Sequence, residues 1–212
     1  MKQYVVIGMG KFGQSLALEL AKMGHEVLGV DIDEASLLSV QDHITHVIVA
    51  DATNEEAIES LGIENFDCAI IAIGDVLQNS ILAAINCKDM GVNAVWAKAT
   101  TKTHARVLEK IGVDRVIFPE QEMGIRTAHL LDSNNVLDYI ALSNEYQLLE
   151  IITHDKWVGK TLGELNFRRN YGVTVIAVRG AEAFEVSPDA NYQINPADVL
   201  VVVGKAKDLD KL

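Results

Sequence analysis

The sequence contains little proline and little cysteine. Only 3 of its 212 residues are proline and 2 are cysteine, whereas 49% are apolar. This composition supports a packed core and gives no sign of a disordered chain. Cys68 and Cys87 stand alone in apolar sequence, without the Cys-x-x-Cys spacing of metal or redox sites. Both are therefore predicted to be small core residues.

Basic residues and long apolar runs are also scarce. Eighteen lysine and arginine residues against thirty acidic residues give a net charge of −12. Such a surface repels phosphate backbones, so nucleic acid is not an expected partner. No apolar run approaches the roughly 18 to 20 residues of a membrane helix. The N-terminus passes at once into a strand-like run and leaves no room for an export signal. We expect a cytoplasmic protein that does not insert into a membrane.

Short runs rich in valine and isoleucine alternate with amphipathic stretches in the first part of the chain. This alternation is typical of repeated βα units and predicts a parallel sheet buried on both faces. The expected fold class is α/β, a doubly wound sheet of the Rossmann type. The predicted strands are residues 4–7, 26–30, 46–49, 67–72, 94–98 and 115–118.

The pattern changes after Pro119. A helical pattern over about residues 121–131 leads into a polar cluster at 132–135, which is typical of a turn or helix cap. We predict a nucleotide-binding domain over residues 1–120 and a crossover helix with a hinge over 121–134. A smaller α+β domain is expected over 135–212. Within it we predict a short helix at 136–142 and strands at 148–152, 173–178 and 199–203.

A glycine-rich motif ends the first predicted strand and opens a helix. Gly8 permits a tight turn, Gly10 lets backbone N–H groups approach a pyrophosphate, and Gly13 allows close contact between helix and strand. The phosphates would lie at the positive end of the helix. Asp31 follows 18 residues after Gly13, close to the spacing of the carboxylate that binds ribose hydroxyls. The motif therefore predicts nucleotide binding, and Asp31 argues against a 2′-phosphate.

Lys11 lies in the first turn of the same helix. A lysine there places positive charge beside the phosphates, which favours ATP or ADP over a dinucleotide; the alternative is a solvated surface lysine. The segments Asp51-Ala52-Thr53 and Ile73-Gly74-Asp75 follow the third and fourth strands, where ligands gather in open α/β sheets. For Thr53 and Asn54 the alternative is helix capping.

The sequence does not contain the usual patterns of an enzyme. None of its five tyrosines is followed by a lysine four residues on, and Gly159-Lys160-Thr161 lacks the first glycine of a P-loop because position 154 is His154. We predict a binding protein rather than an enzyme. A module that senses NAD or NADH is the first alternative, and an NAD-dependent oxidoreductase is the second.

Longer motifs resemble the RCK (regulator of potassium conductance) family, with its TrkA-N and TrkA-C domains, and especially the regulatory subunits of bacterial Ktr potassium transporters. The resemblance is seen in four parts of the chain: V-I-G-M-G-K-F-G at 6–13, G-H-E-V-L-G-V-D-I-D at 24–33, V-L-E-K-I-G-V-D-R-V-I-F-P-E at 107–120, and W-V-G-K-T-L-G-E-L with Y-G-V-T-V-I-A-V-R in the tail. The resemblance implies homodimers that assemble into an octameric ring. The ring would lie beneath an integral-membrane potassium-translocating subunit, and ATP would favour activity over ADP.

The resemblance also implies which residues bind the nucleotide, with lysine at position 11 where an arginine is usual. Glu120 would lie near the terminal phosphates and hold a divalent cation such as Mg²⁺; its alternative role is a favourable charge at the helix start. Some relatives bind cyclic di-AMP, which would use Val175, Ile176, Ala177, Val178 and Arg179 here; the alternative is a core strand. The implied nucleotide-binding residues are Gly8, Gly10, Lys11, Phe12, Gly13, Asp31, Ile32, Asp33, Asp51, Ala52, Ile73, Gly74, Asp75, Lys98, Ala99, Thr100, His104 and Glu120.

Overall fold

A computed structural model describes residues 1–74, 76–133, 135–181 and 183–212. The predicted site residue Asp75 lies outside the described residues, as does Asn134 of the polar cluster. The chain divides into two compact units, Met1–Glu120 and Gln121–Leu212. Within the described residues, no helix combines the length and the apolar character that a membrane crossing requires.

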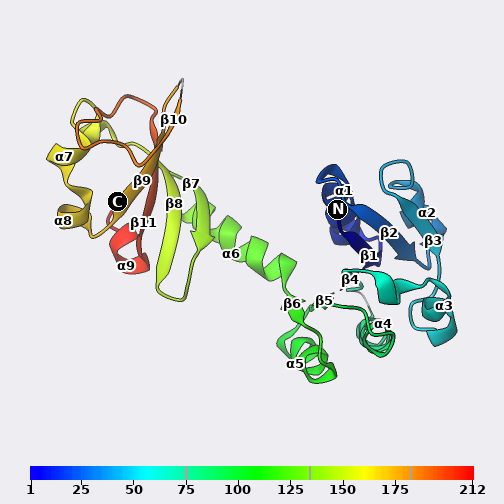
Figure 1. The fold of residues 1–212 in the computed structure, drawn as a ribbon. Helices are drawn as coiled ribbons and strands as arrows, with labels where there is room; N and C mark the ends of the chain where they lie inside the picture. Colours follow the sequence, from blue (N-terminus) through cyan, green and yellow to red (C-terminus); the bar gives the residue numbers. More distant parts are fainter. Residues whose placement is uncertain (75, 134, 182) are drawn as a thin grey trace. The chain divides into compact units, whose positions relative to one another are not determined.

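The first unit contains the predicted six-stranded parallel sheet, which confirms the α/β fold class (Figure 1). Its strand order is β3-β2-β1-β4-β5-β6, so the direction of winding reverses between β1 and β4. Each strand begins and ends within two residues of its predicted bounds. The strands are β1 (Gln3–Ile7), β2 (Glu26–Asp31), β3 (His46–Val49), β4 (Cys68–Ile71), β5 (Val95–Lys98) and β6 (Arg115–Ile117).

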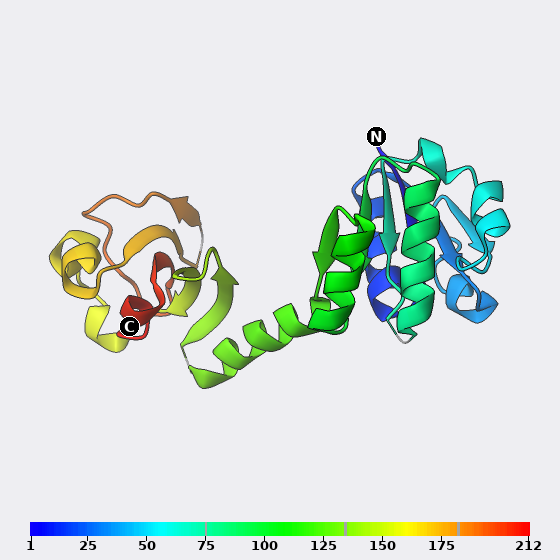
Figure 2. The same cartoon turned by 90° about the horizontal axis from the view of Figure 1, so that it is seen from below.

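Helices cover both faces of this sheet. Val6 packs with residues of α1 (Lys11–Lys22) and α2 (Glu34–Leu38). Its neighbours Val5 and Ile7 point the other way and pack with residues of the remaining helices. Those helices are α3 (Glu55–Ser60), the short 3₁₀ helix η1 (Ile63–Asn65), α4 (Leu77–Asp89) and α5 (Lys102–Ile111). Figure 2 shows α4 and α5 beside each other on their side of the sheet.

Both cysteines lie in this core, as predicted. Cys68 is 8% exposed and Cys87 is completely buried. Burial raises the pKa of the Cys87 thiol to about 12, because the thiolate would be poorly solvated there. The two thiols therefore act as small apolar side chains.

The second unit contains a five-stranded antiparallel sheet in the order β10-β9-β11-β8-β7. Its core surrounds Trp157, whose ring packs edge-on against Phe167. The strands are β7 (Val136–Ala141), β8 (Tyr146–Ile152), β9 (Thr174–Arg179), β10 (Phe184–Val186) and β11 (Val199–Lys205). Its helices are all of α6 (Pro119–Asp132) after Glu120, the 3₁₀ helix η2 (Asp155–Trp157), α7 (Leu162–Leu165), α8 (Phe167–Tyr171) and α9 (Ala206–Leu209).

The predicted helix at 136–142 is wrong, because this segment forms strand β7. β7 pairs antiparallel with β8, with Tyr139 opposite Leu149. Tyr139 is 8% exposed and stacks on the ring of His129 from α6, at 3.9 Å between ring centroids. A segment this short has no periodicity that distinguishes a helix from a strand. Its pairing with β8 and its burial therefore determine that it forms a strand. Strand β10 was not predicted.

Helix α6 begins at the end of the first unit and runs into the second. Among its described residues none is buried. Arg126 donates two hydrogen bonds to the Asp138 carboxylate of β7, at 2.9 and 2.7 Å, which is the bidentate geometry of a strong ion pair. The interior residue Gly124 has open space where a side chain would lie. The second half of α6 is thus joined to β7 by specific contacts.

Candidate functional site

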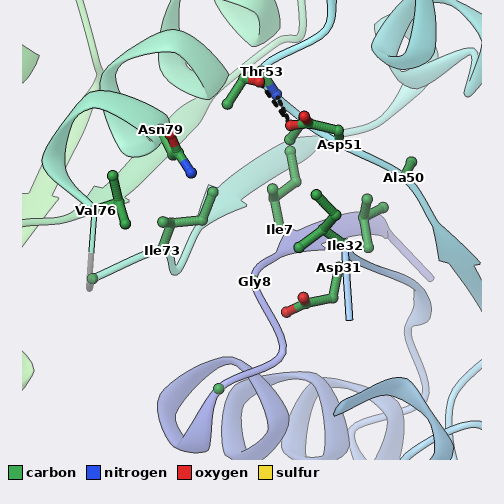
Figure 3. A pocket seen from close by; sticks show the side chains of 14 residues that line it. Ile7, Gly8, Asp31, Ile32, Ala50, Asp51, Thr53, Ile73, Val76 and Asn79 are labelled. Atoms are coloured by element: carbon green, nitrogen blue, oxygen red, sulfur yellow. Dashed lines mark hydrogen bonds between the residues drawn. The ribbon is translucent and has the colours of Figure 1, made fainter. Parts of the chain in front are cut away.

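A cavity opens at the carboxyl ends of β1, β2, β3 and β4, where the strand order reverses (Figure 3). This is the place where open α/β sheets bind ligands. We call it the strand-end cavity. It is lined by Ile7, Gly8, Gly10, Val30, Asp31, Ile32, Ala50, Asp51, Ala52, Thr53, Ile73, Gly74, Val76 and Asn79.

The glycine loop between β1 and α1 forms one wall of the cavity. Gly8 has a φ of +98°, and a Cβ there would lie 3.0 Å from the backbone N of Ile73. A Cβ on Gly13 would lie 1.9 Å from the Gly8 carbonyl oxygen, which no packing change can accommodate cheaply. A Cβ on Gly10 would meet no atom within 4 Å. Gly8 and Gly13 are therefore needed by the fold, whereas Gly10 leaves space beside the cavity.

The N-terminus of α1 offers uncapped backbone donors beside that space. Gly10 is the N-cap and supplies no side-chain hydrogen bond, and the first turn contains no acidic residue. The free N–H groups and the helix dipole together attract an anion. Lys11, the first residue of α1, is exposed and adds positive charge to the same turn. This arrangement suits a phosphate group.

Asp31 connects the end of β2 to the glycine loop. One carboxylate oxygen accepts a hydrogen bond from the N–H of Met9 at 2.5 Å, and the other accepts one from the N–H of Asp33 at 2.9 Å. An ionised carboxylate accepts about four hydrogen bonds, so further lone pairs remain for hydroxyl donors. Asp31 therefore shapes the loop and also presents an acceptor to the cavity.

The loop after β3 forms the opposite wall. One Asp51 oxygen accepts hydrogen bonds from the N–H and the hydroxyl of Thr53, at 2.9 and 2.7 Å. The buried side chain of Asn86 donates to the carbonyl of Ala52 at 2.9 Å and so holds this loop in place. Asn54 caps α3 by accepting from the N–H of Ala57 at 3.1 Å, so the capping alternative is correct for Asn54. Thr53, in contrast, lines the cavity.

Lys98, at the end of β5, lies between the cavity wall and the start of α6. A Cβ on Gly74 would lie 3.1 Å from the Lys98 ammonium nitrogen, and this nitrogen is 2.5 Å from a carboxylate oxygen of Glu120. The Lys98 side chain is only 13% exposed, whereas that of Glu120 is 66% exposed. The hydrogen bond from Lys98 lowers the pKa of Glu120. Both predicted residues thus meet, although neither lines the cavity.

The structure brings eight of the predicted nucleotide-binding residues into the cavity lining: Gly8, Gly10, Asp31, Ile32, Asp51, Ala52, Ile73 and Gly74. The predicted residues that lie elsewhere among the described ones are Lys11, Phe12, Gly13, Asp33, Lys98, Ala99, Thr100, His104 and Glu120. Asp33 caps α2, accepting from the N–H of Ala35 at 3.2 Å. Lining residues that were not predicted are Ile7, Val30, Ala50, Val76 and Asn79; the first three could have been found as strand ends.

His104 is completely buried in the first turn of α5. Neither ring nitrogen has a hydrogen-bond partner among the described residues. Burial lowers the pKa of His104, because the charged imidazolium ion loses its water there. A direct contact between His104 and a nucleotide therefore stays a prediction.

We expect the protein to lose stability as the pH falls below about 6.5, the usual pKa of histidine. The unfolded chain takes up a proton at His104 there, whereas the folded chain keeps the ring neutral to lower pH, so protonation favours unfolding. One such group contributes a slope of at most about 1.4 kcal/mol per pH unit. Urea unfolding near pH 7.5 and near pH 5.5 measures this effect. His104→Leu should remove it, and an unchanged pH dependence in that variant would contradict the explanation.

The predicted cyclic di-AMP segment forms most of β9. Val178 belongs to the core, and Arg179 donates to Glu150 at 3.0 Å. Val175 lines a separate surface groove together with Asn166, Arg168 and others. Cyclic di-AMP binding in this groove stays a prediction.

The described part of the chain contains no complete cation site. Within the ranges that the structure describes, no three His, Cys, Asp or Glu side chains come together in a group that could hold a metal ion. Glu120 is a single carboxylate that pairs with Lys98. A cation at Glu120 would need further ligands, such as the phosphates of a nucleotide.

Comparison with known families decides the classification. The family model for the TrkA-N domain matches residues 4–119, and the model for the TrkA-C domain matches residues 147–212. The chain belongs to the TrkA-N/TrkA-C family. It is 42% identical over 210 residues to Ktr system potassium uptake protein A of Bacillus subtilis, covering 99% of this chain and 95% of the relative. Protein C of the same system is 39% identical with the same coverage. Ktr protein A of Vibrio alginolyticus is 36% identical, covering 96% of this chain and 92% of the relative.

Solved structures share the fold of this TrkA-N/TrkA-C chain. The GsuK RCK domain superposes with a TM-score of 0.68 at 18% identity, covering 99% of this chain and 46% of that one. A GsuK channel bound to NAD gives 0.66 at 17% identity, covering 98% and 38%. The chain thus spans less than half the length of these GsuK chains. At such identities the likeness shows the fold alone.

Proposed function

We propose that the chain is a nucleotide-sensing regulatory subunit of a Ktr-type potassium transporter and acts by binding rather than by catalysis. The observation that carries this proposal is the strand-end cavity. Its glycine loop, the uncapped start of α1 and the Asp31 carboxylate offer separate partners for the phosphates and the sugar of one nucleotide.

An adenine nucleotide fits these partners best. Backbone N–H groups at Gly10 and the charge of Lys11 would hold the phosphates, and Asp31 would accept hydrogen bonds from the ribose hydroxyls. The flat base would lie between apolar side chains, for which Ile32 and Ile73 are available. Asp31 would repel the extra phosphate of NADP. We propose ATP and ADP as the ligands, with NAD or NADH as the alternative.

The partners are inferred from the relatives. Ktr potassium uptake proteins A and C of Bacillus subtilis match almost the entire chain. We therefore propose that this chain works at the cytoplasmic face of a membrane, bound to an integral-membrane potassium-translocating subunit. We further propose that it forms homodimers that assemble into an octameric ring. Mg²⁺ held between Glu120 and the nucleotide phosphates, and cyclic di-AMP in the second unit, are further proposals of the same kind.

Calorimetry with ATP, ADP, NAD and NADH tests the ligand. We expect ATP and ADP to bind with one site per chain, because the cavity offers one phosphate position at α1. A second measurement compares potassium uptake by the membrane subunit with and without this chain, in ATP and in ADP. Tight NADH binding without ATP binding would overturn the ligand assignment, and uptake that is the same with and without the chain would overturn the regulatory role.

A further inference from the structure

The Lys98 ammonium group lies at the junction between the strand-end cavity and helix α6. Lys98 ends β5, and the register between β5 and β6 places it opposite Ile117. Pro119 and Glu120 begin α6 directly after β6. This arrangement brings the Glu120 carboxylate within 2.5 Å of the ammonium nitrogen.

A continuous series of close contacts leads from the glycine loop to this ion pair. The position of a Cβ on Gly8 is 3.0 Å from the backbone N of Ile73, and Ile73 and Gly74 both line the cavity. The position of a Cβ on Gly74 is 3.1 Å from the Lys98 ammonium nitrogen. The Lys98 ammonium group therefore lies against Gly74 of the cavity wall while it holds Glu120.

The chemistry of the two groups allows another anion to replace the Glu120 carboxylate beside Lys98. Lys98 is a flexible cation that is mostly removed from water, so it needs an anion nearby. Glu120 is mostly exposed, so it loses little when water replaces the ammonium group. A nucleotide phosphate carries more negative charge than one carboxylate and would compete for the same ammonium group.

We propose that Glu120 is a built-in competitor of the nucleotide phosphates for Lys98. Without nucleotide, Glu120 holds Lys98; with nucleotide, the phosphate chain takes the ammonium group and releases the first turn of α6. This inference rests on the proposed function, because it needs a nucleotide in the strand-end cavity. It assigns ligand sensing to an ion pair within one chain, whereas the cation role of Glu120 requires a metal.

The competition would distinguish nucleotides by their number of phosphates. A triphosphate offers one more charged group than a diphosphate, so ATP should displace Glu120 more completely than ADP. The released end is the start of α6, whose later residue Arg126 is joined to β7 through Asp138. The state of the ion pair would thereby reach the second unit through the helix itself.

Calorimetry in the presence of a chelator tests the proposal, since it removes divalent cations. We expect Glu120→Gln to bind ATP about twofold to fivefold more tightly than the natural sequence, the range set by one partly exposed ion pair. Glu122→Gln is the matched control, because it makes the same charge change at an exposed position two residues further along α6. It should leave the affinity within about 1.5-fold.

A double substitution makes the test specific. Lys98→Gln should weaken ATP binding, and adding Glu120→Gln to it should change nothing further, because the competitor has lost its target. Unchanged or weaker ATP binding by Glu120→Gln without divalent cations would overturn the competition. If the natural sequence binds neither ATP nor ADP, the proposed function fails first, and that result is distinct from a failure of the competition.

Discussion

Gly13→Ala should destabilise the first unit by about 3 kcal/mol and abolish nucleotide binding. An alanine in a helix interior normally stabilises a protein by up to about 1 kcal/mol relative to glycine. Here the new Cβ would lie 1.9 Å from the Gly8 carbonyl oxygen, so α1 must move away from β1. The expected sign is therefore reversed, and the movement would distort the loop that lines the cavity. Urea unfolding and calorimetry measure the two effects.

Two other glycines provide matched controls for this prediction. Gly124→Ala places the same methyl group in the interior of α6, where no atom lies within 4 Å, and should stabilise the protein slightly. Gly10→Ala should cost no more than about 1 kcal/mol, because its Cβ also meets no atom within 4 Å and only the poorer N-cap preference of alanine opposes it. It should still weaken nucleotide binding, because the methyl group enters the space proposed for the phosphates. Normal stability and normal nucleotide binding in Gly13→Ala would show that α1 and β1 can accommodate a Cβ at position 13, and would contradict this prediction.

Asp31→Ala should lower the affinity for ATP and ADP at least about 100-fold. The substitution removes the acceptor proposed for the ribose hydroxyls, and hydrogen bonds to a charged group contribute about 1.5 to 3 kcal/mol each. It also leaves the N–H of Met9 without its 2.5 Å partner, which loosens the glycine loop. Calorimetry with each nucleotide measures the loss.

Asp42→Ala is the control for Asp31→Ala, since it removes one negative charge from an exposed position outside the cavity lining. Its affinity should match that of the natural sequence. Asp31→Asn should fall between the two, because the amide keeps one acceptor oxygen but loses the charge. Equal affinities in Asp31→Ala and Asp42→Ala would place the ligand elsewhere.

Local backbone requirements made the first unit predictable. Strands buried on both faces need apolar residues at every position, and helices between them need apolar residues on one side. The inner strands β1, β2, β4 and β5 are mostly buried and follow this pattern. The edge strands β3 and β6 are more exposed, but they are short and rich in valine and isoleucine, so all six strands were found. The segment 136–142 lacked such a constraint, because seven mostly apolar residues suit a helix or a strand. Its pairing with β8 decided the outcome.

The cavity was predictable where a motif or the end of a predicted strand fixes it. The glycines and Asp31 have fixed roles in the turn after β1, so their positions follow from the sequence. Asn79 and Val76 lie in or just before α4 and reach the cavity through the packing of that helix, for which no short motif exists. Lys98 and Glu120 were both predicted, but not as partners, since their meeting depends on how β5 and β6 end side by side.

The reversal of strand order at β1 has a consequence for the newly made chain. The glycine loop emerges from the ribosome early, but Ile73 and Gly74, which lie close to Gly8, follow β4, and β4 pairs with β1 only after β2 and β3 have been synthesised. A nascent chain that ends before Cys68 therefore carries the loop without the surface it closes against. The proposed nucleotide site is therefore complete only once β4 has paired with β1, and a chain truncated before Cys68 is expected not to bind nucleotide.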